Sequence, residues 1–145
     1  MATTTATITL TSPAFSGGGI HTDSLALTKQ ATLYKADSTT GLDQTTGLSR
    51  ETLSATTNIV LLDSTALGVN KAGKVYIANL SEEPTEYVII TINAQIIGRL
   101  YAGDWMFVPW SQSDAAGNVE LQPSVATSME IGYMLIHEGK TQTSA

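Results

Sequence analysis

The chain has 145 residues, enough for one domain with a single hydrophobic core, and it contains no cysteine, which excludes disulfides and cysteine-based metal sites. Its formal charge of −6, with only seven scattered Lys and Arg residues, argues against nucleic acid and anionic membranes as partners, because both bind clustered positive charge. Charged residues make up only 14% of the chain, whereas threonine occurs 22 times. This composition is typical of extended β proteins and of surfaces that pack into assemblies.

Neither a membrane span nor an export signal is predicted. Uninterrupted apolar runs fall well short of the roughly 18 residues that a spanning helix needs. The first residues, MATTTATITLTSPAF, lack both the basic region and the apolar region of a secretory signal. We therefore expect a soluble protein that is not exported by the usual route.

Residues 1–19 are predicted to form an N-terminal arm. Residues 7–11 (TITLT) alternate between threonine and an aliphatic residue, which indicates one strand, and residues 17–19 form a triple-glycine elbow. Such an arm can add a strand to a neighbouring subunit, or it can pair within its own sheet or fray, and the sequence leaves these alternatives open. Residues 20–138 are assigned to a β-sandwich domain and residues 139–145 to a polar tail.

Three segments make up the first part of the predicted domain. Residues 24–36 indicate one or two strands, although their Leu, Ala, Lys and Gln content also permits a helix. Residues 39–49 hold the near-repeat TTGLDQ and TTGLS and predict a polar loop or hairpin. Residues 58–63 (NIVLLD) form a short apolar run that is compatible with a strand buried on both faces.

Residues 74–110 predict consecutive strands separated by polar turns. In the segment VIITI, alternate residues lie on one side of an extended chain, and β-branched side chains suit a pleated surface. Further strands are expected at residues 119–122 and 129–137. With eight or nine strands and no long amphipathic helix, the fold class is predicted to be all-β, a β-sandwich of jelly-roll or related type, with a small barrel as the alternative.

The aromatic residues gather in one strand and at its end. Alternation places Trp105 and Phe107 together on one face of this strand and Trp110 on the other. We predict that Trp105 and Phe107 lie in the core. This leaves Trp110 as the candidate for an exposed interface.

No catalytic constellation is found. The two histidines, His21 and His137, match neither a nucleophile elbow nor a metal-binding spacing. Asp104 follows a glycine and is expected to fix a turn, and residues 82–86 (EEPTE) are expected to form a solvated hairpin tip. The sequence therefore predicts no catalytic residues, no cofactor, no metal site and no enzyme activity.

Two segments of the second half, IGRLYAGDWMFVPWS and VELQPSVATSMEIGYMLIHE, resemble the C-terminal half of small β-rich virion structural proteins of tailed bacteriophages. In those chains a strand, a glycine turn and an aromatic-rich strand ending in proline precede a loop and a final strand of the form xEIxYxLIxE. The resemblance covers about residues 73–138 and includes no catalytic signature, and residues 1–72 have no counterpart. The matching positions are Leu100, Gly103, Asp104, Phe107, Pro109, Glu130, Tyr133, Ile136 and Glu138.

The resemblance implies a non-enzymatic virion protein, most simply a capsid cement or decoration protein that binds between subunits of the major capsid protein and stabilises the shell. It also implies a homo-oligomer, with a trimer favoured, that is made in the host cytoplasm and located on the capsid surface. We expect the arm around Ile8 and Leu10, together with Trp110, to carry the contacts.

Other functions remain open at this point. The protein could be a tail- or fibre-associated component, or a carbohydrate- or receptor-binding module on the virion. Such a module would use an exposed aromatic residue beside a carboxylate, with Asp104, Trp105 and Trp110 as the candidate set. A small jelly-roll enzyme would need a metal or an acid–base cluster, which two isolated histidines do not provide.

Overall fold

The computed structural model describes residues 3–12, 25–36, 38–63, 71–110 and 117–138, and these ranges contain strands and turns but no helix. The all-β prediction is therefore confirmed, with eleven strands instead of eight or nine. In the same ranges no helix could cross a membrane. The strands are β1 (Thr5–Ser12), β2 (Leu25–Thr32), β3 (Gln44–Thr45), β4 (Ser49–Leu53), β5 (Ile59–Leu62), β6 (Gly73–Asn79), β7 (Tyr87–Ile92), β8 (Gln95–Tyr101), β9 (Trp105–Pro109), β10 (Val119–Pro123) and β11 (Met129–His137).

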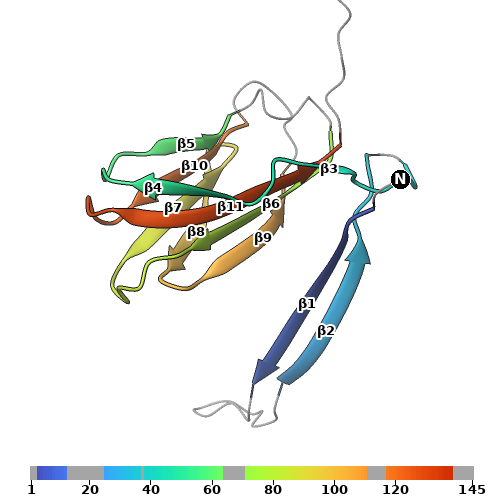
Figure 1. Ribbon diagram of the computed structural model, residues 1–145, viewed down its shortest axis with the longest axis horizontal. Coiled ribbons are helices and arrows are strands. Elements are labelled where there is room, and N and C mark those ends of the chain that lie inside the picture. The colour runs from blue at the N-terminus through green and yellow to red at the C-terminus, as the bar shows by residue number, and fades with distance from the viewer. Residues whose placement is uncertain (1–2, 13–24, 37, 64–70, 111–116, 139–145) are drawn as a thin grey trace, which may run out of the picture.

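Eight of these strands form a jelly-roll sandwich (Figure 1). One sheet has the order β4-β11-β6-β9, with β3 also paired to β11, and the other has the order β5-β10-β7-β8. Among the eight strands β4 to β11, the first in the chain pairs with the last, the second with the second-last, and so on. The pairs are β4 with β11, β5 with β10, β6 with β9, and β7 with β8. A long antiparallel hairpin that is rolled into two facing sheets has this pairing, which is the jelly-roll arrangement.

The core lies between the two sheets and is built from inward-facing aliphatic side chains. In β7, Val88, Ile90 and Ile92 are buried and the residues between them are half-buried, as the alternation of a strand requires. Removal of these side chains from water is the main force that holds the sheets together. The buried cluster consists of Leu53, Leu62, Val75, Ile77, Val88, Ile90, Ile92, Leu100, Trp110, Val119, Leu121, Met129, Ile131 and Leu135.

The predicted elements differ from the observed ones mainly at the edges of the sheets. β3 lies within residues 39–49, where a polar loop or hairpin was predicted. β4 begins at the last of these residues and was not predicted, because it buries only Leu53 and so lacks the alternation that marks a half-buried strand. The prediction that residues 58–63 are buried on both faces is wrong, since Val60 of the edge strand β5 is 50% exposed. The helix considered for residues 24–36 is also wrong, because β2 occupies this segment.

Strands β1 and β2 form a separate two-stranded sheet, called the ribbon below, that projects from the sandwich (Figure 1). They pair antiparallel along their whole length, from Thr5 opposite Thr32 to Ser12 opposite Leu25. The strand expected in the arm therefore exists and pairs within its own chain, and the glycine elbow at residues 17–19 lies outside the described residues. The projecting part comprises both strands of the ribbon and not the N-terminal arm alone.

Candidate assembly surface

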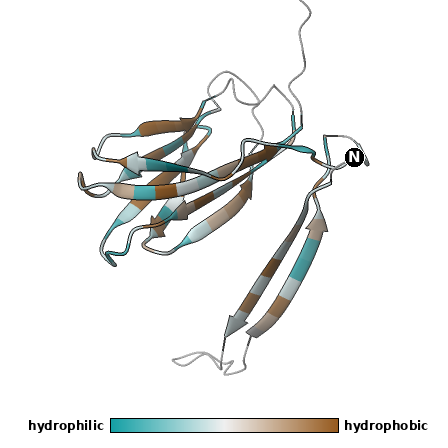
Figure 2. Cartoon of the chain, in the orientation of Figure 1, coloured by the Kyte–Doolittle hydropathy of each residue, from teal (hydrophilic) through white to brown (hydrophobic). Residues whose placement is uncertain are grey.

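The ribbon has one apolar face and one threonine-rich face, because residues directly opposite each other in an antiparallel pair share a face. The apolar face includes Ala6, Ile8, Leu10, Leu27 and Ala31, together with the polar residues Ser12 and Lys29. The opposite face consists of Thr5, Thr7, Thr9, Thr11, Ala26, Thr28, Gln30 and Thr32. Figure 2 shows this alternation as brown bands between paler ones along the ribbon. The ribbon is therefore amphipathic, like a sheet that has a covering layer on one side.

The rest of the chain leaves the apolar face of the ribbon partly open. Ile8 and Leu10 are 39% and 42% exposed and so are open to contacts, while the expectation that they carry contacts stays a prediction. Lys29 is the one charged residue in the two strands. Because an isolated two-stranded ribbon is at best marginally stable in water, this ribbon needs further contacts, either at its base or from another molecule.

A second, smaller hydrophobic cluster anchors the base of the ribbon to the sandwich. Leu33, directly after β2, is buried together with Leu42 and Ile136, and Phe107 of β9 packs against them. The N–H of Leu33 donates to the carbonyl of Thr4 (3.0 Å), and the N–H of Leu42 donates to the carbonyl of Leu33 (2.7 Å). Apolar packing therefore fixes the base to β9 and β11, and the backbone hydrogen bonds join the segments of the base to one another.

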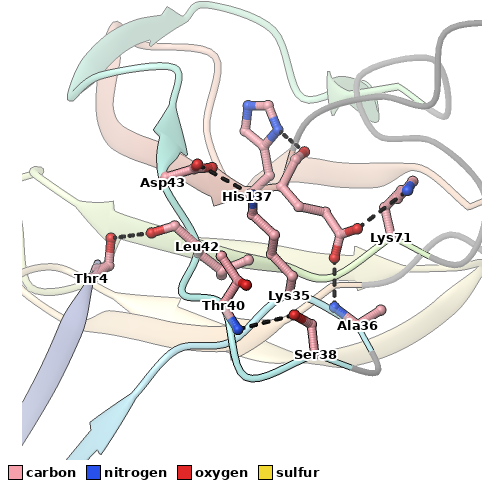
Figure 3. A network of polar contacts seen from close by, with 10 residues as sticks. Thr4, Lys35, Ala36, Ser38, Thr40, Leu42, Asp43, Lys71 and His137 are labelled. Carbon is pink, nitrogen blue, oxygen red and sulfur yellow. Dashed lines mark hydrogen bonds and ion pairs between the residues drawn. The ribbon is translucent and has the colours of Figure 1, made fainter. Parts of the chain in front are cut away.

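The carboxylate of Glu138 joins three segments of the chain at this base (Figure 3). Its Oε2 accepts hydrogen bonds from the N–H groups of Ala36 (2.6 Å) and Ala72 (3.0 Å), and its Oε1 lies 3.3 Å from Nζ of Lys71. Ala36 follows β2, Ala72 precedes β6, and Glu138 follows β11. Only 6% of Glu138 is exposed, so these charge-assisted contacts are shielded from water and hold the end of β2 against the sandwich.

The partners of Glu138 keep this buried group ionised. Burial by itself raises the pKa of a carboxyl group, because desolvation penalises the charged form. The N–H groups of Ala36 and Ala72 and the ammonium of Lys71 oppose this effect, and together they lower the pKa of Glu138 below its ordinary value of 4.5. At neutral pH the carboxylate is therefore charged and can accept all of these contacts.

A polar turn lies at the same place. The N–H of Lys35 donates to the carbonyl of Thr40 (2.8 Å), and Nζ of Lys35 lies 3.2 Å from Oδ2 of Asp43. His137 appears beside this turn in Figure 3, and its Nδ1 contacts the carbonyl oxygen of Glu138 at 2.6 Å. Among the described residues no group of three His, Asp or Glu side chains could hold a metal ion. The network is one that fixes backbone positions.

An apolar groove of about 800 Å³ lies between the ribbon and the outer face of the sheet that contains β9. On this outer face Tyr76 lies opposite Phe107 in the β6–β9 register, and its ring centroid is 6.4 Å from that of Trp105. Trp105 is 52% exposed. The outward-facing residues of a sandwich are ordinarily polar, so these aromatic side chains make this face unusually apolar, a feature common to contact surfaces.

The predicted interface residue Trp110 lies in the core instead. It is 1% exposed, and its Nε1–H donates to the carbonyl of Gly117 (2.8 Å), which satisfies its polar group. Trp105 and Phe107, which were predicted to lie in the core, face outward and line the groove. The alternation within the strand was predicted correctly, but the two faces were assigned the wrong way round, because each face carries large apolar side chains.

The other predicted sites have local structural roles or lie outside the described residues. The turn predicted at Asp104 is confirmed, because its Oδ2 accepts a hydrogen bond from the N–H of Tyr101 (2.9 Å). Residues 82–86 are not a hairpin tip but connect β6 to β7, which belong to different sheets. His21 lies outside the described residues.

Two parts of this surface were not predicted. Glu138 follows an apolar strand, and nothing in the sequence around it indicates that its partners come from Ala36 and Ala72. The sequence did contain a signal for the pairing of the arm with β2, because LALTKQAT has alanine or threonine at three of four alternate positions (26, 28 and 32), much as the arm has threonine at alternate positions. Comparisons with protein-family models, with curated proteins and with solved structures found no match to this chain.

Proposed function

We propose that the protein is a structural component of a tailed-bacteriophage virion, most simply a capsid cement or decoration protein that binds between subunits of the major capsid protein. The observation that carries the proposal is the projecting ribbon, with one charge in two eight-residue strands and an apolar face that its own chain leaves partly open. A segment of this kind suits a contact with an extended protein surface.

The fold and the composition support the same proposal. The jelly roll is an architecture of viral capsid proteins, although it also occurs in lectins, and a fold by itself does not set a function. The low charge, the abundant threonine and the resemblance of residues 73–138 to small virion proteins agree with a role in assembly. The described residues provide no metal cluster, and His137 contacts a backbone carbonyl.

The proposed mechanism is mechanical. The Glu138 contacts join the end of β2 to the sandwich, and by limiting the movement of the ribbon they would lower the entropy lost when the ribbon binds. A protein that grips several capsid subunits at once stabilises the shell, because it binds the assembled form and not the separate subunits. A homo-oligomer, such as the trimer that the resemblance implies, would increase this effect through avidity.

The test is the copy number per particle, measured by quantitative mass spectrometry of gradient-purified virions against the major capsid protein. We expect a number comparable to that of the capsid protein. A handful of copies would indicate a tail or fibre component instead, and complete absence from particles would refute the virion proposal.

A carbohydrate- or receptor-binding module is a second candidate, favoured by the exposed ring of Trp105 beside Tyr76 and Asp104. Trp110 leaves the candidate set, because it is buried. A glycan array probed with the wild type and with Trp105→Ala tests this function. Binding that the substitution abolishes would favour it, and an array without any signal would eliminate it.

A further inference from the structure

β9 forms one edge of its sheet, on the side of the ribbon, and it lines the apolar groove (Figure 1). Within the described residues it pairs with β6 alone. Five consecutive residues, 103–107, line the groove. Because side chains alternate between the two faces of a strand, a groove that touches every residue of this run also reaches its backbone.

Hydrogen bonds at both ends of β9 show which of its backbone groups face β6. At one end the N–H of Asn79 donates to the carbonyl of Asp104 at 2.9 Å. At the other end the N–H of Trp110 donates to the carbonyl of Gly73, also at 2.9 Å. Directly opposite residues of an antiparallel pair are alternately bonded and non-bonded. The even-numbered residues of β9 are therefore the ones bonded to β6.

The odd-numbered residues of β9 direct their backbone groups to the open edge. Trp105 and Phe107 each present one N–H and one C=O there, and the side chains of the same two residues line the groove. Pro109 has no N–H, so it ends this run of donors. An edge of this kind can accept one further strand, whose side chains on the outer face would enter the groove.

The other edges of the two sandwich sheets have features that discourage such pairing. Each of β5 and β8 has a shift of register against its neighbour, and an irregular edge pairs poorly with a further strand. β4 carries Arg50 and Glu51, and β3 has only two residues. β9 has an unbroken register and no charged residue. It is therefore the edge of the sandwich most suited to binding another strand.

We infer that the edge of β9 and the groove together bind a short, extended, uncharged segment of a different polypeptide, which adds to the sheet as a strand. In stacked sheets one residue occupies about 160 Å³, from a strand spacing of about 4.8 Å, a sheet spacing of about 10 Å and a rise of about 3.4 Å. The groove of about 800 Å³ thus has room for roughly five residues of one strand, as many as β9 contains. The inference does not rest on the virion proposal, because it concerns the chemistry of the segment and not the protein that carries it.

The walls of the groove set the chemistry of the segment. Ile8 and Leu10 on the ribbon and Trp105 on the sheet are partly exposed, so the segment needs an apolar side chain at every second position. Among the described lining residues there is one cation, Lys29, and one anion, Asp104, so the groove has no net charge to attract a charged segment. Main-chain hydrogen bonds to the edge would supply affinity, and the apolar positions would supply specificity.

The experiment uses the full-length protein and a library of capped hexapeptides in which threonine alternates with valine, isoleucine, leucine or phenylalanine. Binding is followed by NMR through the backbone amide signals, and hydrogen exchange is then measured with the tightest binder. We expect at least one peptide to bind with a dissociation constant below about 1 mM. In that complex the amides of Trp105 and Phe107 should exchange at least about tenfold more slowly than in the free protein. Met106 and Val108 are the internal controls, because their N–H groups already bond to β6 and their exchange should change much less.

Two variants locate the bound segment. Leu10→Lys places a charge on the ribbon wall and should weaken peptide binding about tenfold or more, on the order of a hot-spot residue. Ile96→Lys is the matched control and should bind like the wild type, because Ile96 is 73% exposed on β8 of the other sheet and lies outside the groove. Near-ultraviolet circular dichroism, which reports on the buried Trp110, verifies that each variant is folded.

Four results would overturn the inference. The first is that none of the peptides binds at about 1 mM. The second is binding without slower exchange at Trp105 and Phe107, because the peptide would then pack on the sheet without pairing. The third is binding that Leu10→Lys leaves unchanged. The fourth is slow exchange of the two amides in the free protein that becomes faster on dilution, which would assign the edge to a second copy of this chain.

The copy number in virions tests the proposed function separately. Peptide binding with the expected exchange pattern, in a protein that is absent from virions, would refute only the proposed function. A protein found at capsid-like copy number that binds no peptide would refute only this inference.

Discussion

The sandwich and the ribbon are both built from antiparallel strands with aliphatic residues at alternate positions, yet these side chains are buried to different degrees. In the sandwich, the inward residues of the central strands, such as Ile77 and Leu135, are completely buried. In the ribbon, the equivalent residues Ile8 and Leu10 keep about two-fifths of their surface in water. Both regions therefore have hydrogen-bonded strands, but only in the sandwich does a second sheet cover the apolar face of the first.

This difference indicates which region contributes most of the free energy of folding. A backbone hydrogen bond contributes little net free energy, because the unfolded chain makes similar bonds to water, whereas burial of an aliphatic side chain contributes about 1.5–3 kcal/mol. The ribbon therefore depends on its base, where the cluster around Leu33 and the carboxylate of Glu138 connect it to the sandwich. Three experiments test whether the sandwich and the ribbon differ in stability in this way.

The largest effect is expected from the two tryptophans, which form a matched pair because Trp105 begins β9 and Trp110 directly follows it. Trp110→Ala should lower the free energy of unfolding by about 3–5 kcal/mol, because it opens a cavity in the core and removes a hydrogen-bonded ring. Trp105→Ala, at a half-exposed ring, should lower it by less than about 1 kcal/mol. Urea denaturation of the two variants measures the contrast. Equal losses would mean that the groove wall is part of the stabilising core.

The sandwich could be predicted from the sequence wherever a strand has one buried face. The alternation of VIITI placed Val88, Ile90 and Ile92 together in the core, and the prediction of an all-β sandwich followed from repeated segments of this type. Edge strands gave a weaker signal. β4 pairs with β11 along its length but buries only Leu53, so its side chains follow no pattern that a sequence could show.

The candidate site could be predicted only in part, and the reason is geometric. Alternation in residues 105–110 fixes which side chains share a face, but which face points inward depends on the opposite sheet, and this explains the reversed assignment of Trp105 and Trp110. The partners of Glu138, Ala36 and Ala72, are more than 60 residues distant in the chain. They bind through backbone N–H groups, which almost every residue has, so the sequence does not show which residues bind the carboxylate. Ile8 and Leu10 were expected to carry contacts because their alternating strand lies in an arm followed by a glycine elbow, and this stays a prediction for two side chains that are partly exposed.

An intermediate effect is expected from removal of the charge of Glu138. Glu138→Gln replaces an oxygen that accepts two N–H groups or one that pairs with Lys71, so it should cost about 1–3 kcal/mol, the range for buried groups that lose a partner. Glu130→Gln is the matched control, on β11, the strand that Glu138 follows. The pair of Glu130 with Arg50 is exposed, and its loss should change the free energy of unfolding by less than about 0.5 kcal/mol. Hydrogen exchange adds a regional readout, because faster exchange at Leu33 and Leu42 with unchanged exchange at Ile77 and Leu135 would place the loss at the ribbon base. Uniformly faster exchange would contradict a division between ribbon and sandwich.

The smallest effect is a dependence on pH that the same carboxylate confers. The pKa of Glu138 is lower in the folded protein than its ordinary value of 4.5, so the unfolded chain binds the proton more tightly than the folded one does. The stabilisation is therefore complete above the ordinary value and is lost as the pH falls from there through the lower pKa of the folded state. Other carboxyl groups titrate in the same range, so the quantity to measure is the difference in free energy of unfolding between the wild type and Glu138→Gln, from pH 7 to the acid limit of folding. This difference should be constant above the ordinary pKa and should shrink below it, and a difference that does not change in acid would show that the contacts at the ribbon base do not depend on the charge of Glu138.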